Sequence, residues 1–207
     1  MKQSLVMVAE VYEANHIMTG EIPMTAKMEN DFFCAVVQGL IHEDRELRNL
    51  FAQNGDKYRK QHNGVTCLYE TTMVYITMKQ LLKTNFPLTV SWEHPYPDRP
   101  EWKADLGLLN DDQTIHSLVE FKIWLSEDGH EILGDIQKFK QSSFNGGRYL
   151  CVVELMGGDI ESNRKFLNNM PGVHVEYCEG FQTGAYSMQK QKVASAWVNV
   201  YLLKVVD

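Results

Sequence analysis

The run from His116 to Trp124, HSLVEFKIW, is the feature that most constrains how this chain folds. It is rich in β-branched and aromatic residues and follows polar turn residues, a pattern that predicts a β-strand. Side chains alternate along a strand, so Glu120 and Lys122 share one face. The opposite face is apolar and consists of Val119, Phe121 and Ile123. A carboxylate and an ammonium on a buried strand are costly unless they pair or bind a metal ion, so this pair is a candidate functional site.

Length and composition predict an ordinary globular protein. The chain has 207 residues, of which 44% are hydrophobic and 23% charged, enough apolar mass for a real core. We expect one domain over residues 1–207. Within it we expect an N-terminal helical extension at 1–65, a central core at 66–155 and a C-terminal sheet extension at 156–207.

Cysteine spacing and charge limit the class of protein. The four cysteines are widely spaced with no CxxC, which predicts reduced core thiols in a cytoplasmic protein rather than a disulfide frame or zinc site. The apolar run Leu5 to Ala9 is too short for a secretory signal, and no stretch is long enough to span a membrane. The net charge of −7 argues against a sequence-independent nucleic-acid coat protein. A nuclease stays compatible, because its site is itself acidic.

Hydrophobic periodicity predicts alternating helices and strands. The predicted helices cover 29–52, 67–84, 135–143 and 161–169, and the predicted strands cover 86–93, 104–109, 115–124, 149–155, 173–178 and 194–205. Between the first two helices, a loop with two Asn-Gly turns carries Lys57, Arg59 and Lys60. This loop is either a solvated connection or a basic segment that contacts phosphates.

The turn between the second and third strands determines where Asp105 lies. An even-length turn after Asn110 places Asp105 opposite Leu118, and therefore on the face of Glu120 and Lys122. An odd-length turn would place it on the other face. Two carboxylates at this separation suit Mg²⁺, which takes a few carboxylate oxygens and leaves places for water and a phosphate oxygen. A lysine beside them can orient the attacking water.

The order helix, three strands, helix, strand, with an acid on the first helix and D…ExK on the second and third strands, resembles the PD-(D/E)XK nuclease superfamily. Here the motif reads Ala104-Asp105 and Glu120-Phe121-Lys122, with Glu70 on the leading helix, and the resemblance covers about 66–155. It implies an α/β fold with a restriction-endonuclease-like αβββαβ core and a mixed central sheet. Ala104 replaces the usual proline. The literal Pro97-Asp98 lies in a proline-rich break off the strand, so we do not assign Asp98 to the site.

The resemblance also implies roles for these residues. Asp105, Glu120 and the backbone carbonyl of Phe121 would hold Mg²⁺, for which Mn²⁺ would substitute. Lys122 would position the nucleophile, and Glu70 would help to bind a second metal ion or the water. The activity implied is Mg²⁺-dependent hydrolysis of DNA phosphodiester bonds.

The helix after the motif carries further residues that the resemblance assigns to DNA contact, namely Gln137, Lys138 and Gln141. Asp135 is predicted to be the N-cap of this helix. Two alternatives stay open at this point: a non-catalytic binding or defence-related protein with the nuclease fold, and an unrelated α/β protein with an accidental ExK. The form of DNA bound, the choice between endonuclease and exonuclease, and a homodimeric state are also left open.

Overall fold

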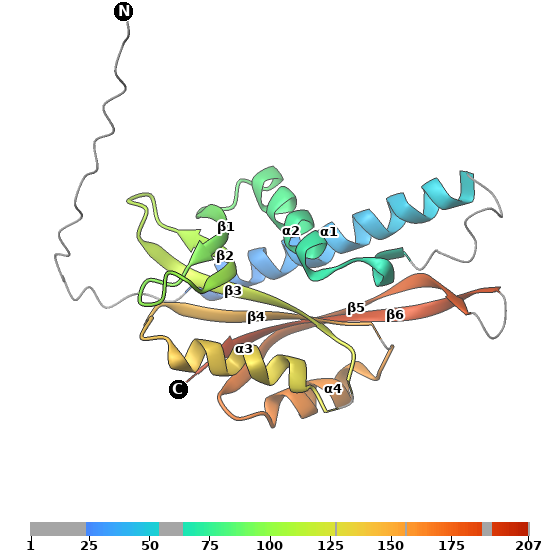
Figure 1. The fold of residues 1–207 in the computed structure, drawn as a ribbon. Helices are drawn as coiled ribbons and strands as arrows, with labels where there is room; N and C mark the ends of the chain where they lie inside the picture. The colour runs from blue at the N-terminus through green and yellow to red at the C-terminus, as the bar shows by residue number, and fades with distance from the viewer. Residues whose placement is uncertain (1–23, 54–63, 127, 156, 188–191, 207) are drawn as a thin grey trace, which may run out of the picture.

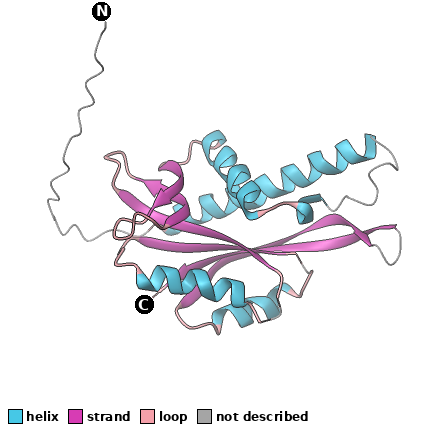
Figure 2. Ribbon diagram, in the orientation of Figure 1, coloured by secondary structure: helices cyan, strands magenta, loops and turns pink. Residues whose placement is uncertain are grey.

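Helices cover both faces of one mixed β-sheet (Figure 1). The computed structural model describes residues 24–53, 64–126, 128–155, 157–187 and 192–206. Helices α1 (Ala26–Gln53) and α2 (Glu70–Lys83) lie on one side of the sheet, and α3 (His130–Gln141) and α4 (Ile160–Asn168) lie on the other (Figure 2). The general α/β class predicted from sequence is therefore confirmed.

The sheet is six-stranded, with the order β1-β2-β3-β4-β6-β5. Its strands are β1 (Thr89–Pro95), β2 (Lys103–Leu109), β3 (Ile115–Trp124), β4 (Gly147–Glu154), β5 (Val173–Ser187) and β6 (Lys192–Val205). Strands β3 and β4 are parallel, whereas every other neighbouring pair is antiparallel. Parallel neighbours need a crossover connection, and α3 supplies it. The C-terminal strands extend the same sheet, as the sequence predicts.

The first core layer lies between the sheet and the pair α1 and α2. Val119 and Phe121 of β3 point into it, as the alternation of β3 predicts. The two helices pack closely because residue 39 is glycine. A Cβ at Gly39 would lie 2.9 Å from Cγ2 of Ile76, so a larger residue would force the helices apart.

The second core layer lies between the sheet and the pair α3 and α4. Ile132, Ile136 and Phe139 recur at helical spacing along α3 and are buried there with Leu150 and Val152 of β4. This layer receives the face of β3 that carries Leu118, and by alternation Glu120 and Lys122 as well. The charged pair of β3 therefore faces α3.

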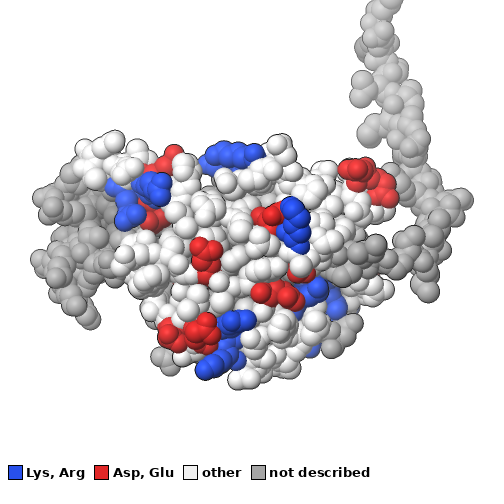
Figure 3. Space-filling model, turned by 180° about the vertical axis from the view of Figure 1, so that it is seen from behind, with Lys and Arg blue, Asp and Glu red and all other residues white. Residues whose placement is uncertain are grey.

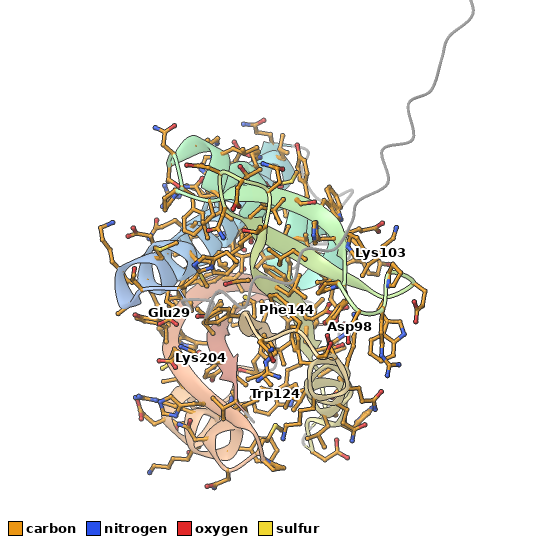
Figure 4. All side chains as sticks on the ribbon, turned by 90° about the vertical axis from the view of Figure 1, so that its left-hand side faces the viewer. Glu29, Asp98, Lys103, Trp124, Phe144 and Lys204 are labelled. Atoms are coloured by element: carbon orange, nitrogen blue, oxygen red, sulfur yellow. The ribbon has the colours of Figure 1, made fainter. Side chains whose placement is uncertain are left out.

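A buried carboxylate of α1 joins that helix to the sheet. Glu29 accepts hydrogen bonds from the Tyr149 hydroxyl, at 2.6 Å, and from Lys204 Nζ, at 3.1 Å. Figure 4 shows Glu29 and Lys204 next to each other. Because one cation and one hydroxyl both bind its Oε1, Glu29 is a structural residue. Cys34, on the same helix, is exposed, so the prediction that all the cysteines are core residues is wrong for this one.

The predicted elements exist, but several boundaries differ. Helix α2 begins at Glu70, after a 3₁₀ turn at Gly64–Cys67. Strand β5 continues to Ser187, and β6 begins at Lys192, so the two form a longer ribbon than predicted. Helix α3 begins at His130, five residues before the predicted start at 135. None of the helices in the described ranges is both long enough and apolar enough to cross a membrane.

Candidate functional site

The register between β2 and β3 places the first two candidate carboxylates side by side. Leu106 pairs with Val119 and Gly107 with Leu118. Continuing this register by one residue puts Asp105 opposite Glu120. The predicted face is therefore right, but the predicted partner, Leu118, is wrong. The Asn110 N–H donates to the Thr114 carbonyl, so the turn is odd-length and the predicted even-length turn is wrong. The register shifts by one further residue between Leu108 and Leu109, and the two changes together move the pairing by two residues and keep Asp105 on the predicted face.

Asp105 is held by the backbone of the neighbouring strand. Its Oδ2 accepts a hydrogen bond of 2.7 Å from the backbone N–H of Phe121. Burial raises the pKa of Asp105; the Phe121 hydrogen bond opposes this increase, and the nearby carboxylates of Glu70 and Asp135 add to it. Several acids thus share one small volume, an arrangement that a cation would stabilise.

Lys122 lies between two carboxylates that come from opposite sides of the sheet. Its Nζ is 3.3 Å from the Glu70 carboxylate and 3.2 Å from Oδ2 of Asp135. Glu70 is the first residue of α2, and its Oε1 also accepts a hydrogen bond of 2.9 Å from the N–H of Ile123. Burial acts to lower the pKa of Lys122, but Asp135 and Glu70 outweigh it and raise that pKa above its ordinary value. Lys122 is therefore an ammonium at neutral pH.

Glu120 is buried and has two donors on one oxygen. The Tyr96 hydroxyl donates to Oε1 at 2.8 Å, and Lys138 Nζ contacts the same oxygen. Lys138 also donates to the Lys103 carbonyl at 2.7 Å and lies 5.1 Å from the centre of the Tyr96 ring. Burial raises the pKa of Glu120 to about 7; Lys138 opposes this shift, and Asp105 adds to it. Lys138, which the resemblance assigns to DNA contact, also balances the charge of Glu120.

Asp135 belongs to the same group, which the sequence did not predict. Helix α3 begins at His130 after Gly129, whose φ is 62°. Asp135 is thus inside the helix and is not its N-cap, so that prediction is wrong. Burial raises its pKa, while Lys122 opposes the increase. Its Oδ2 is buried and has no aligned hydrogen-bond donor, although the Lys122 ammonium is near.

The four acids are called the carboxylate cluster below: Glu70, Asp105, Glu120 and Asp135. Two surface hollows flank it. The first, of about 550 Å³, is lined by Tyr69, Glu70, Thr71, Lys122, Ile123, Leu125 and Glu131. The second, of about 430 Å³, is lined by Trp102, Lys103, Gly134, Gln137, Lys138 and Gln141. The three α3 residues predicted to contact DNA therefore share one hollow beside the cluster.

The predicted basic loop cannot be placed in this arrangement, because Lys57, Arg59 and Lys60 lie outside the described residues. On the side of the molecule seen in Figure 3, Lys and Arg form separate groups, several of them beside Asp or Glu, and do not form a continuous band. Nucleic-acid contact on that side would rely on local groups of cations and not on one long basic stripe.

Two other acidic features do not belong to the cluster. Asp98 accepts hydrogen bonds from the Ser142 hydroxyl, at 2.7 Å, and from the N–H of Ser143, at 2.6 Å. The Ser142 hydrogen bond lowers the pKa of Asp98. Figure 4 shows Asp98 near Phe144, a residue of the loop after α3. Asp98 thus stabilises a helix end, in agreement with its exclusion from the predicted site.

The second feature is exposed. Within the described residues, the one group of three metal-binding side chains whose ligand atoms all lie within 4.8 Å of each other is Asp128, His130 and Glu131. Asp128 and His130 are exposed and hydrogen-bonded to each other at 3.0 Å. Their hydrogen bond at the N-terminus of α3 explains the group without a metal ion. No three acids of the carboxylate cluster are as close as this. A cation there would rely on two carboxylates, a backbone carbonyl and water.

Comparison with known proteins adds no assignment: no family model, curated protein or solved structure matches this chain.

The raised pKa of Glu120 gives a prediction about stability. The carboxyl of Glu120 binds a proton more tightly in the folded protein than in the unfolded one. Its contribution to the free energy of unfolding is therefore complete below pH 4.5 and is lost as pH rises to about 7. Each unit of pKa corresponds to about 1.4 kcal/mol, so the contribution is on the order of 3 kcal/mol. We expect the free energy of unfolding of wild type to fall by this amount relative to Glu120→Gln between pH 4.5 and 7.

Urea denaturation in EDTA measures this difference, because EDTA removes any bound cation that would favour the ionised carboxyl. The comparison with Glu120→Gln cancels the titration of the carboxylates that do not interact with Glu120. A parallel pH dependence of the two proteins would show that Glu120 is already ionised at pH 5 in the folded state.

Proposed function

We propose that this protein is a Mg²⁺-dependent nuclease of the PD-(D/E)XK type that hydrolyses phosphodiester bonds in DNA. The observation that carries the proposal is the convergence of Glu70, Asp105, Glu120 and Lys122, from one helix and two strands, on one partly open site. These are the four residues to which the sequence motif assigns catalysis.

The arrangement of elements supports the same proposal. The order α2, β1, β2, β3, α3, β4 has three antiparallel strands followed by a parallel fourth strand, which agrees with the αβββαβ core that the resemblance implies. In this core, the motif residues lie on the two central strands and the extra acid on the leading helix. A chance ExK would not be expected to bring a distant Glu70 to within 3.3 Å of Lys122.

The donor set fits a hard divalent cation. Asp105 uses one oxygen for the N–H of Phe121, which leaves its second oxygen for a metal ion. Glu120 receives both of its donors on Oε1, which likewise leaves Oε2. The Oδ2 of Asp135 instead faces the Lys122 ammonium, at 3.2 Å. Mg²⁺ prefers a small number of protein oxygen ligands, of which one or two are carboxylates, and Mn²⁺ accepts the same ligands.

In this proposal Asp105, Glu120 and the carbonyl of Phe121 hold Mg²⁺. Bound there, the ion would lower the pKa of a water molecule and stabilise negative charge on the phosphate. Lys122 contributes as a fixed ammonium, because Glu70 and Asp135 raise its pKa. It therefore donates to the attacking water or to a phosphate oxygen and does not remove the proton. Glu70 keeps Lys122 in place and contacts the N–H of Ile123.

A second candidate function is a non-catalytic nucleic-acid-binding protein with the same scaffold. The observation that favours it is the pairing of the acids with lysines: Lys138 contacts Glu120, and Lys122 contacts Glu70 and Asp135. Such a network balances charge without a metal ion. The two candidates differ in one respect: a nuclease cleaves nucleic acid when Mg²⁺ is added, whereas a binding protein only binds it.

The test is cleavage by the purified full chain. Labelled single-stranded DNA, duplex DNA and RNA are incubated with Mg²⁺, with Mn²⁺ or with EDTA. We expect cleavage of DNA with either metal ion and none with EDTA. Binding of DNA without cleavage under any metal ion would support the second candidate. If the protein neither binds nor cleaves any nucleic acid, both functions are excluded.

A further inference from the structure

We infer that the substrate is an unpaired strand whose bases on the two sides of the scissile phosphate enter the two hollows beside the carboxylate cluster. This inference rests on the proposed nuclease function and adds the form of nucleic acid on which the site acts. It depends on the lining of each hollow, on the position of the cluster between them and on their separation.

The first hollow suits a base better than a phosphate. Tyr69 on its rim is 79% exposed, and Leu125 is 57% exposed, so an aromatic ring and an aliphatic side chain are both open to contact. The cation in its lining is Lys122, which Glu70 and Asp135 already partner. A phosphate placed here would lie against carboxylates, whereas a base can stack on an aromatic ring irrespective of sequence.

The second hollow combines an aromatic ring with polar and cationic groups. Trp102 lines it, and the Arg99 guanidinium lies 4.4 Å from the centre of the Trp102 ring. Gln137 and Gln141 supply amide donors and acceptors of the kind that pair with base edges. Lys103 lines the same hollow, and its ammonium is exposed and lies 3.3 Å from the exposed Glu93 carboxylate. The hollow thus combines a partly exposed aromatic ring, which has the Arg99 guanidinium over it, with two amides and an ammonium.

The cluster lies between the hollows because of the way α3 runs past it. Glu131 of this helix lines the first hollow, and Gln137 lines the second. Asp135 lies between them in sequence and contacts Lys122. On β3, Lys122 borders the first hollow, while Glu120 contacts Lys138 of the second. A strand that occupies both hollows therefore passes over the carboxylates.

The spacing of the lining residues along α3 favours an unpaired strand. Glu131 lines the first hollow and Gln137 the second, and α3 rises about 9 Å between these two residues at 1.5 Å per residue. Bases stacked in a duplex rise by only about 3.4 Å per strand. Neighbouring bases that occupy the two hollows must therefore be unstacked. Unstacking opposes the binding of a duplex and costs least where the strand is already single.

Binding without turnover tests the inference. Fluorescence anisotropy with Ca²⁺ in place of Mg²⁺ is measured for a fluorescein-labelled oligonucleotide, single-stranded and annealed to its complement. We expect the wild-type protein to bind the single strand at least about 10-fold more tightly than the duplex. Loss of one stacked base costs about 1–3 kcal/mol, so Trp102→Ala and Tyr69→Ala should each weaken single-strand binding by about 5- to 150-fold.

Matched variants separate stacking from folding. Trp197→Ala removes an indole that is 49% exposed on β6, outside both hollows, and should leave binding unchanged. Trp102 packs edge-on against Tyr96, with 6.1 Å between ring centres, so Trp102→Phe is included to keep an aromatic ring if Trp102→Ala unfolds. It should keep most of the binding. Tyr69 is too exposed for its loss to affect folding.

Three outcomes would overturn the inference: equal or tighter binding of the duplex, unchanged single-strand binding by both Tyr69→Ala and Trp102→Ala, or an equal loss from Trp197→Ala. If the protein still cuts DNA in Mg²⁺ in such a case, the nuclease function stands and only the substrate form is wrong. If wild type neither binds nor cuts nucleic acid, the proposed function fails as well.

Discussion

Asp105→Asn is expected to abolish Mg²⁺-dependent cleavage of DNA. The asparagine carbonyl can still accept the hydrogen bond from the N–H of Phe121, which is 2.7 Å from the wild-type carboxylate. What is lost is the negative charge and with it the anchor of the cation. Loss of a group that only supports a metal ligand costs about 10- to 100-fold in affinity or activity, and loss of a ligand should cost more.

Two measurements check this prediction: Mg²⁺ binding by calorimetry and cleavage with Mg²⁺ or Mn²⁺. Asp98→Asn is the matched control, because it removes a carboxylate that contacts Ser142 and Ser143 and lies outside the cluster. It should leave both quantities unchanged. If Asp105→Asn binds Mg²⁺ and cuts DNA as wild type does, the metal ion is held elsewhere and the assignment of Asp105 is wrong.

The faces of the central hairpin were predictable from sequence because alternation is a local property. Val119 and Phe121 had to share one face and Glu120 the other, whatever the partner strand. The structure places the first two in the core layer beneath α1 and α2. The partner of Asp105 was less predictable. A register shift at Leu108 and Leu109 depends on how the turn closes, and hydrophobic alternation does not encode it.

The role of Asp135 was missed for a different reason. An aspartate before an apolar helix is a common N-cap, and that local signal was given precedence. The spacing of Ile132, Ile136 and Phe139 already places Asp135 inside one continuous amphipathic helix. Its position against Lys122 depends on the crossover from β3 to β4, a long-range feature. Glu70 was on its helix as predicted, but its contact with Ile123 also required the fold.

Lys122→Met is expected to suppress cleavage by about 10²- to 10⁴-fold and to keep Mg²⁺ binding. This is the range of rate enhancement that a positioned proton-transfer or hydrogen-bonding group supplies. Lys122 is held 3.3 Å from Glu70 and 3.2 Å from Asp135, so it is positioned to act on the water and on the developing charge. Methionine keeps the unbranched chain and removes the ammonium. The two acids then lose a competing cation, so Mg²⁺ affinity should be equal to that of wild type or higher.

Lys165→Met is the matched control, because it removes an exposed ammonium at the end of α4, outside the cluster and both hollows. Calorimetry with Mg²⁺ and cleavage under saturating Mg²⁺ distinguish a catalytic from a structural role for Lys122. Loss of both metal binding and thermal stability in Lys122→Met, together with rescue of both by Lys122→Arg, would mean that this residue only balances the charges of Glu70 and Asp135. Full cleavage activity in Lys122→Met would remove the lysine from the mechanism, and the water would then have to be oriented by the carboxylates alone.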